Sequence, residues 1–176
     1  MIDIVIRRLS AAEADAALGD LAEVLFDCVD GGASVSFMAP FTRDDAHAFF
    51  ASLAPELVAG TRVLLAAYDG DALVGTVQLV HAWPPNQPHR ADVTKLLVHR
   101  SARGRGVGRL LMEALEEHAR VDGKTVLVLD TVTDGDAHRL YARLGWTEVG
   151  EIPDFALYPD GRLCATTFFY KRVPPR

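Results

Sequence analysis

Cysteine, long apolar runs and excess positive charge are all scarce or absent in this sequence. The 176 residues include only two cysteines, Cys28 and Cys164, which stand in no disulfide framework and in no metal-ligand or redox spacing. No apolar run approaches the ~20 residues that a membrane helix needs, and the N-terminal residues lack the basic segment of a secretion signal. The net charge of −6 argues against binding driven by nucleic-acid phosphates. We therefore expect a cytoplasmic protein with no membrane, nucleic-acid or metal site.

Composition and periodicity indicate one domain, assigned to residues 1–173, followed by a C-terminal tail at 174–176. A hydrophobic content of 49% is enough for one well-packed core in a chain of this length. Apolar periodicity predicts strands over residues 2–9, 62–68, 72–81, 91–98, 125–129, 147–152 and 163–173. It predicts helices over residues 10–29, from 42 with a break near Pro55, from 107 to a stop at Gly123, and over 136–144. The near-continuous apolar strand at 125–129 is expected to be buried on both faces.

A glycine- and arginine-rich turn lies between an apolar strand and an amphipathic helix. It reads Arg103-Gly104-Arg105-Gly106-Val107-Gly108. The glycines allow the backbone to turn tightly, and the first N–H groups of the following helix have no intrahelical partner. The helix dipole and the arginines favour negative charge at the same place. The turn therefore predicts a binding site for a diphosphate.

The glycine spacing excludes two other kinds of diphosphate loop. A dinucleotide-binding turn has the spacing G-x-G-x-x-G, and a Walker loop needs G-x-x-x-x-G-K-[ST]; neither fits here. The spacing that fits is Arg-x-x-Gly-x-Gly, carried by Arg103, Gly106 and Gly108. It resembles the acetyl-CoA pyrophosphate loop of the GCN5-related N-acetyltransferase (GNAT) superfamily. The alternative is a glycine-rich turn with solvated arginines.

A second segment and the order of the elements resemble the same superfamily. Residues 140–146, Leu-Tyr-Ala-Arg-Leu-Gly-Trp, are similar to its L-Y-x-x-x-G-[FW] segment, and the predicted order β-α-α-β-β-β-α-β-α-β is that of its fold. Stretches at 31–35, 101–106, 129–131 and 159–163 resemble the tabtoxin-resistance acetyltransferase branch. The resemblance implies an α/β (α+β) fold. Its mixed, mostly antiparallel sheet would have about seven strands, splayed between the fourth and fifth and flanked by four helices.

The resemblance implies an enzyme, an acyltransferase that carries an acetyl group from acetyl-CoA to a primary amine. The acceptor implied is a small molecule, such as an amino-acid-like metabolite, toxin or antibiotic, which attacks directly within a ternary complex. The enzyme would be a monomer or a homodimer. The alternative is a non-catalytic acyl-CoA-binding or regulatory module on the same fold.

The resemblance also assigns residues to the cofactor. The backbone of Leu97 and Val98 would bind the pantetheine arm, with the Leu97 N–H as oxyanion donor. Asp134 stands where the family often has an asparagine that holds this arm, and the change removes the amide donor. The residues expected to bind acetyl-CoA are Leu97, Val98, Arg103, Gly104, Arg105, Gly106, Val107, Gly108, Arg109, Asp134, Ala137 and Tyr141.

Tyr141, in the second motif, is the predicted general acid for the coenzyme thiolate. The ordinary pKa of tyrosine, ~10, keeps the phenol protonated at neutral pH, so it can hand over a proton. The alternative is a core tyrosine that only packs its ring.

Two carboxylates at strand ends are predicted to bind and deprotonate the amine. Asp92 begins the fourth predicted strand, and Asp130 closes the fifth. Burial at the edge of an apolar sheet raises the pKa of a carboxyl group, which suits a general base. In the structural alternatives, Asp92 pairs with Arg90 or Lys95, and Asp130 caps a turn through the threonines that follow it.

The loop between the first two predicted helices supplies the remaining predicted contacts with the acceptor. Ser34, Ser36 and Phe37 lie in this loop, at 31–38, where the family has a variable loop that shapes the acceptor pocket. The alternative for the two serines is the ordinary polarity of a surface loop.

Overall fold

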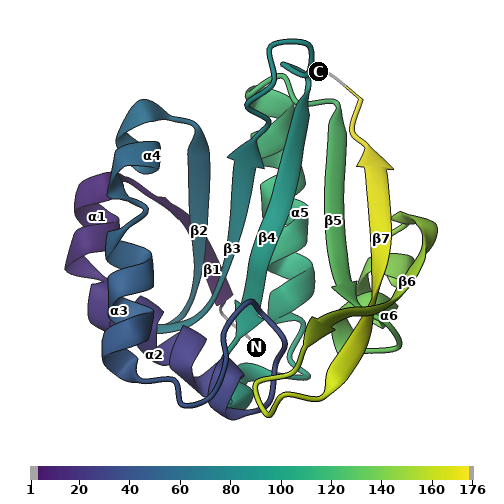
Figure 1. Ribbon diagram of the computed structural model, residues 1–176. Helices are drawn as coiled ribbons and strands as arrows, with labels where there is room; N and C mark the ends of the chain where they lie inside the picture. The colour runs from purple at the N-terminus through teal and green to yellow at the C-terminus, as the bar shows by residue number, and fades with distance from the viewer. Residues whose placement is uncertain (1–3, 175–176) are drawn as a thin grey trace.

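The computed structural model describes residues 4–174 and contains one seven-stranded sheet with helices on both faces (Figure 1). The sheet order is β1-β2-β3-β4-β5-β7-β6, and within residues 4–174 the only parallel neighbours are β4 and β5. The strands are β1 Ile4–Leu9, β2 Arg62–Asp69, β3 Ala72–His81, β4 Arg90–Val98, β5 Val126–Val132, β6 Thr147–Leu157 and β7 Leu163–Arg172. The helices are α1 Ala11–Ala16, α2 Leu18–Asp30, α3 Arg43–Ala51, α4 Ala54–Ala59, α5 Val107–Val121 and α6 Asp136–Arg143, with a 3-10 turn at Arg100–Ala102.

Two of the four predicted helices are each split in two. The Ser10 side chain accepts from the Glu13 N–H and begins α1 with a capping box, as predicted, but the helix is interrupted at Ala17. Thr42 begins α3 in the same way, and Pro55 stands in the first turn of α4. Proline lacks the N–H that a continuing helix would need, so the break at Pro55 was predictable. The interruption at Ala17 was not predictable, because alanine does not break a helix.

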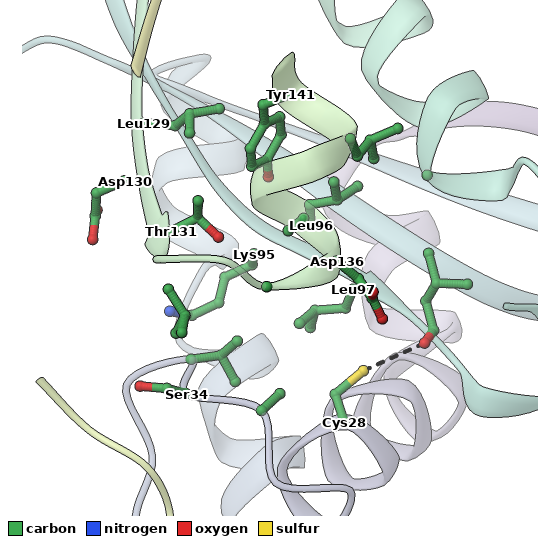
Figure 2. A pocket seen from close by; sticks show the side chains of 18 of the residues that line it. Cys28, Ser34, Lys95, Leu96, Leu97, Leu129, Asp130, Thr131, Asp136 and Tyr141 are labelled. Carbon is green, nitrogen blue, oxygen red and sulfur yellow. Dashed lines mark hydrogen bonds between the residues drawn. The ribbon is translucent and has the colours of Figure 1, made fainter. Parts of the chain in front are cut away.

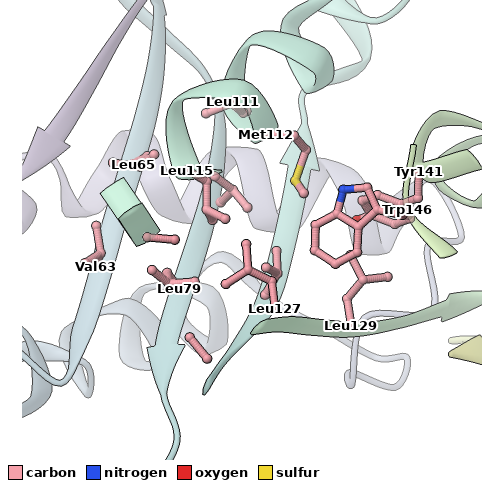
Figure 3. Close-up of a cluster of buried hydrophobic side chains, with 14 of the residues drawn as sticks. Val63, Leu65, Leu79, Leu111, Met112, Leu115, Leu127, Leu129, Tyr141 and Trp146 are labelled. Atoms are coloured by element: carbon pink, nitrogen blue, oxygen red, sulfur yellow. The ribbon is translucent and has the colours of Figure 1, made fainter. Parts of the chain in front are cut away.

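The alternation of side chains along β2 creates two hydrophobic clusters, one on each face of the sheet. Val63 and Leu65 belong to the cluster under α5, which also contains Tyr141 and Trp146 (Figure 3). Leu64 and its even-numbered neighbours belong to the cluster under α2 and α3. Because successive strand residues face opposite sides, one strand contributes to both cores.

The sheet divides where β4 and β5 separate. These strands pair only over Arg90–Asp92 and Val126–Val128, and beyond Asp92 they diverge. The prediction that β5 is buried on both faces is wrong: Leu127 and Leu129 are buried, but Val128 is half-buried and Asp130 is exposed. The second face of β5 is open because it borders the gap between the strands.

Parts of the predicted terminal segments lie outside the described residues. These are residues 2 and 3 of the first predicted strand, and residues 175 and 176 of the tail. Between residues 4 and 174, no helix is long and apolar enough to cross a membrane.

Candidate active site

A cleft of about 1470 Å³ opens where β4 and β5 diverge. Its walls are the end of β4, the turn into α5, the start of α6, the end of β5, the 31–38 loop and the β6–β7 hairpin (Figure 2). The volume exceeds the roughly 300–1,000 Å³ of a pocket for one drug-sized ligand. The cleft therefore has room for two ligands, one on the side of α5 and one on the side of the hairpin; we call these sides the donor half and the acceptor half.

The donor half contains the N-terminus of α5. Gly106 is the N-cap residue and gives no side-chain cap, so the N–H groups of Val107, Gly108 and Arg109 lack helical partners and border the cleft. Gly104 and Gly106 have φ of +73° and +79°, which non-glycine residues rarely adopt. The donor set and the helix dipole suit a diphosphate, so the turn fits the group predicted from its sequence.

The backbone of β4 presents Val98, not Leu97, to the cleft. An added Cβ on Gly75 of β3 would lie 2.9 Å from the Leu97 carbonyl oxygen, so the Leu97 backbone faces β3. The Val98 carbonyl faces away from β3 and accepts from Arg103 Nε at 3.0 Å. Because the N–H and C=O groups of an extended residue point to one side of the strand, the Leu97 N–H is expected to face β3 as well. The prediction that this N–H is the oxyanion donor therefore has no support from the β4 geometry, although Leu97 borders the cleft.

The two arginines of the turn and Arg109, in the first turn of α5, have different surroundings. Arg103 borders the cleft, and its guanidinium also lies 3.7 Å from Cys28 Sγ. Arg109 borders the cleft and pairs with Glu113, one helical turn away. Arg105 does not border it, because its Nη1 pairs at 2.7 Å with Asp69 at the β2–β3 turn. The predicted contact of Arg105 with the diphosphate therefore has no support from this arrangement and stays a prediction.

A buried carboxylate that sequence reasoning missed attaches the end of α2 to the 3-10 turn at Arg100–Ala102. Asp27 is 5% exposed and accepts from the Arg100 N–H at 2.9 Å and from the Arg100 guanidinium. His99 Nε2 and Arg103 Nη2 lie 3.4 and 3.9 Å from the same carboxylate. Cys28, the next residue, donates to the Val98 carbonyl (Figure 2). These contacts hold the end of β4 and the turn in one arrangement.

Helix α6 brings Tyr141 into the cleft. The ring is 5% exposed, lies 5.8 Å from the ring of Trp146, and belongs to the core as well as to the cleft wall. Burial, assisted by the charge of Asp130, raises the pKa of Tyr141 well above its ordinary value. Ala137 borders the cleft, as expected, but Asp134 does not. The Asp134 N–H instead donates to His138 Nδ1 at 3.1 Å, so the expected contact with the pantetheine arm has no support.

The two predicted carboxylates both border the acceptor half. Asp92 forms the last β4–β5 pair, and its Oδ1 accepts from Arg90 Nη1 at 2.5 Å, as the structural alternative expected. Asp130 Oδ2 accepts from Thr166 Oγ1 at 2.9 Å. Asp130 is exposed, so the expectation of a desolvated carboxylate is wrong for it. Its Oδ1 has no partner in the described part of the chain.

The 31–38 loop covers the acceptor half by bonding to the β6–β7 hairpin. Ser34 Oγ donates to the Leu157 carbonyl at 2.7 Å and accepts from Cys164 Sγ at 3.6 Å. Just beyond the loop, the Ala39 N–H donates to the Pro159 carbonyl at 3.0 Å. Ser36 and Phe37 also border the cleft, as predicted.

Sequence reasoning missed one charged residue of the acceptor half. Lys95 borders the cleft, and its Nζ donates to Ser36 Oγ at 3.0 Å rather than pairing with Asp92. A lysine within an apolar strand end was the available signal. The strand irregularity that orients Lys95 has no sequence signature.

Comparison with known proteins agrees with this geometry. Residues 32–146 match the family described as "Acetyltransferase (GNAT) family". An N-acetyltransferase from the hisH–hisA intergenic region of Azospirillum brasilense is 31% identical over 132 residues, which are 74% of this chain and 76% of the relative. Together these similarities establish the family.

Solved structures share the fold over nearly the whole chain. The yncA protein of Salmonella typhimurium, solved with its cofactor acetyl-CoA, has a TM-score of 0.79 at 21% identity, covering 98% of this chain and 95% of that one. The ribosomal-protein-alanine N-acetyltransferase of Brucella melitensis also has 0.79, at 22% identity, covering 96% and 99%. The chain belongs to the acetyltransferase (GNAT) family, whose enzymes take their acetyl group from acetyl-CoA.

Proposed function

We propose that this enzyme acetylates the primary amine of a small molecule, such as an amino-acid-like metabolite, toxin or antibiotic, by direct attack with both substrates bound. The separation of β4 from β5 after three residue pairs carries the proposal. It leaves β4 backbone groups without a strand partner on the side where two carboxylates and a tyrosine meet. A cleft of this size can hold donor and acceptor together, so no covalent enzyme intermediate is needed.

Bound acetyl-CoA supplies the acetyl group as a thioester. The free N–H groups at the start of α5 bind the diphosphate, and the Val98 backbone binds the pantetheine arm. The Leu96 N–H, deeper in the cleft, donates to the carbonyl oxygen of the acetyl group. Such a donor strengthens its hydrogen bond as charge develops on that oxygen, and removing one costs about 10²–10³ in rate in other enzymes.

The acceptor must lose a proton before its nitrogen can attack. Asp130, with one oxygen free of protein partners, takes this proton directly or through a water, and Asp92 helps to hold the amine. The new N–C bond forms as the C–S bond breaks. Tyr141 then donates the proton of its O–H group to the sulfur, and its raised pKa keeps the phenol protonated at neutral pH until that step.

The cover over the acceptor half supports a small acceptor rather than a polypeptide. The Ser34–Leu157 and Ala39–Pro159 hydrogen bonds join the loop to the β6–β7 hairpin across the open side of the cleft. An extended peptide would have to displace both bonds. The narrower resemblance to the tabtoxin-resistance branch stays a prediction.

The test is release of free thiol from acetyl-CoA in the presence of small amines and of short peptides. We expect turnover with small amines, and a loss of kcat/KM when Asp92→Asn and Asp130→Asn are combined. If both substitutions left kcat/KM unchanged, these carboxylates would have no role. Thermal stabilisation by acetyl-CoA, about 2.7 kcal/mol at 100-fold Kd, without turnover of any amine would instead favour the non-catalytic binding module. Preferential acetylation of peptides would refute the small acceptor.

A further inference from the structure

Lys95 occupies an irregular position in β4 at the floor of the acceptor half. Thr94 pairs with Gln78 and Leu97 with Thr76, so Lys95 and Leu96 together face the single residue Val77. This β-bulge gives Lys95 a φ of +54°. A left-handed backbone costs a non-glycine residue roughly 1–2 kcal/mol. The fold therefore holds a lysine at a position where glycine would cost less.

The Lys95 ammonium has polar and aromatic neighbours but no carboxylate partner. Its Nζ donates to Ser36 Oγ at 3.0 Å and lies 5.6 and 5.8 Å from the ring centres of Phe37 and Phe49. Within residues 4–174, no carboxylate oxygen forms an ion pair with it. Burial lowers the pKa of Lys95, an effect that the charge of Asp130 opposes. A partly desolvated cation gains more from an anionic ligand than a solvated one does.

The other charges of the acceptor half are of opposite sign and are partly engaged. Arg90 already neutralises Asp92. Asp130 has only the Thr166 hydroxyl, which leaves its second oxygen free. Among the described residues, the acceptor half thus has in Lys95 a cation without an ion pair and in Asp130 a carboxylate with an available oxygen, on neighbouring walls of the same cleft (Figure 2). The complementary ligand carries both an ammonium and an anion.

We propose that Lys95 binds the carboxylate of the acceptor while Asp130 receives its amine, so that the substrate is an α-amino acid or a close analogue. The proposal rests on the proposed function and narrows its substrate class. A simple monoamine would leave Lys95 without a counter-charge, and a polyamine would bring a second positive charge against it. Both are therefore poorer substrates than an amino acid of the same size.

The experiment compares L-amino acids with their methyl esters and with the amines left by decarboxylation, using wild type, Lys95→Met and Lys95→Arg. Wild type should favour the acid over its ester by about 10- to 100-fold in kcat/KM, as expected for a charged hydrogen bond. Lys95→Met should raise KM for the acid by that factor and leave KM for the ester within about threefold. Lys95→Arg should retain most of the preference. Lys124→Met, which removes a lysine bonded only to the Pro88 carbonyl, is the matched control.

The outcomes separate this inference from the proposed function. Lys95 does not bind a substrate carboxylate if wild type uses acids, esters and amines equally, or if Lys95→Met raises KM for all three alike. In either case small amines would remain the acceptors. If no small amine is acetylated at all, the proposed function fails and this inference fails with it.

Discussion

The two halves of the cleft are built in different ways from the same chain. Most of the donor half comes from one continuous segment, residues 96–109, completed by the start of α6, and the groups proposed to bind there are backbone N–H groups of β4 and of the first turn of α5. The acceptor half comes from four separate segments: the 31–38 loop, the β4 bulge, the end of β5 and the β6–β7 hairpin. Its polar groups are side chains, including Ser34, Lys95 and Asp130.

The difference separates what the enzyme keeps constant from what it can vary. Backbone groups have the same chemistry whatever side chains are attached, so a donor half made of them binds one cofactor. Side chains brought together by the fold can be replaced one at a time, so the acceptor half can be adapted to a particular amine. Substitutions in the two halves should therefore change different kinetic constants.

The largest expected effect belongs to Tyr141, which stands between the halves. Tyr141→Phe removes the proton donor to sulfur but keeps the ring, and we expect kcat to fall about 100-fold or more with every acceptor. KM for acetyl-CoA should change little. Steady-state kinetics with two acceptors measures both constants, with Tyr158→Phe, also in the cleft wall, as control. Because burial raises the pKa of Tyr141, the wild-type rate should show no decline from its ionisation up to about pH 10. An effect that depended on the acceptor would place Tyr141 in the acceptor half.

Substitutions of Arg103 and Arg105 compare the side of the turn that faces the cleft with the side that faces away from it. Arg103→Gln removes the bond to the Val98 carbonyl, and we expect KM for acetyl-CoA to rise about tenfold. Arg105→Gln removes only an ion pair at the β2–β3 turn, and less than a threefold change is expected. The measurement is KM for acetyl-CoA at a fixed acceptor concentration. Equal effects of the two substitutions would mean that the net charge of the turn matters, not its geometry.

Two glycines, one in each half of the cleft, allow the same backbone strain to be introduced into either half by substitution with alanine. Gly106 and Gly32 have φ of +79° and +86°, and neither has an atom within 4 Å of an added Cβ. Alanine at either position costs roughly 1–2 kcal/mol of strain, and we expect the backbone to relieve this strain by moving the groups that border the ligand, which would weaken binding about tenfold. Gly106→Ala should raise KM for acetyl-CoA, and Gly32→Ala should raise KM for the acceptor. An exchange of these two results would contradict the division of the cleft.

A substitution of Ser34 tests the contact between the 31–38 loop and the β6–β7 hairpin, which covers the acceptor half. Ser34→Ala removes its hydrogen bond to the Leu157 carbonyl, and KM for the acceptor should rise about fivefold with KM for acetyl-CoA unchanged. Ser52→Ala, which removes a similar bond to the Phe49 carbonyl far from the cleft, should change neither constant. A fall in acceptor KM would show that the cover obstructs the acceptor rather than holding it.

The smallest expected effect is on thermal stability, and here the substitution should stabilise the protein. Because burial lowers the pKa of Lys95, its charge destabilises the folded state fully at neutral pH, and this penalty declines as pH rises past the lowered pKa toward 10.5. Lys95→Met should therefore raise Tm at pH 7, by about 2–4 °C for each kcal/mol of penalty that it removes. The gain should shrink at alkaline pH. Calorimetry at several pH values, with Lys124→Met as control, measures it; a lower Tm at pH 7 would mean that Lys95 stabilises the fold.

The donor half was predictable from the sequence because its determinants are local. The turn from Arg103 to Gly108 carries its own φ requirements, and the capping residues Ser10 and Thr42 each act within three residues of themselves. Sequence patterns report such short-range preferences well. The positions of the arginine side chains were not predictable in this way, because Arg105 forms an ion pair with Asp69, a residue distant in sequence.

The acceptor half was predictable only as a list of residues. Asp92, Asp130 and the 31–38 loop do lie beside the cleft, and the pairing of Asp92 with Arg90 was one of the expected alternatives, but the partners of Asp130 and Ser34 were not foreseen. The bulge that turns Lys95 inward shifts the register of β4 against β3, and no local preference of lysine indicates it. The bond from Ser34 to Leu157 spans 123 residues of chain. Contacts of this kind depend on the completed fold.

The brief junction between β4 and β5 has a consequence for how such an enzyme diverges. Strands β1–β4 carry the donor backbone, β5–β7 carry Asp130 and the covering hairpin, and three residue pairs join the two groups within the sheet. Changes confined to the β6–β7 hairpin are thus insulated from the backbone of β4 and from the turn before α5. A lineage can explore new acceptors through that hairpin while keeping the same acetyl donor.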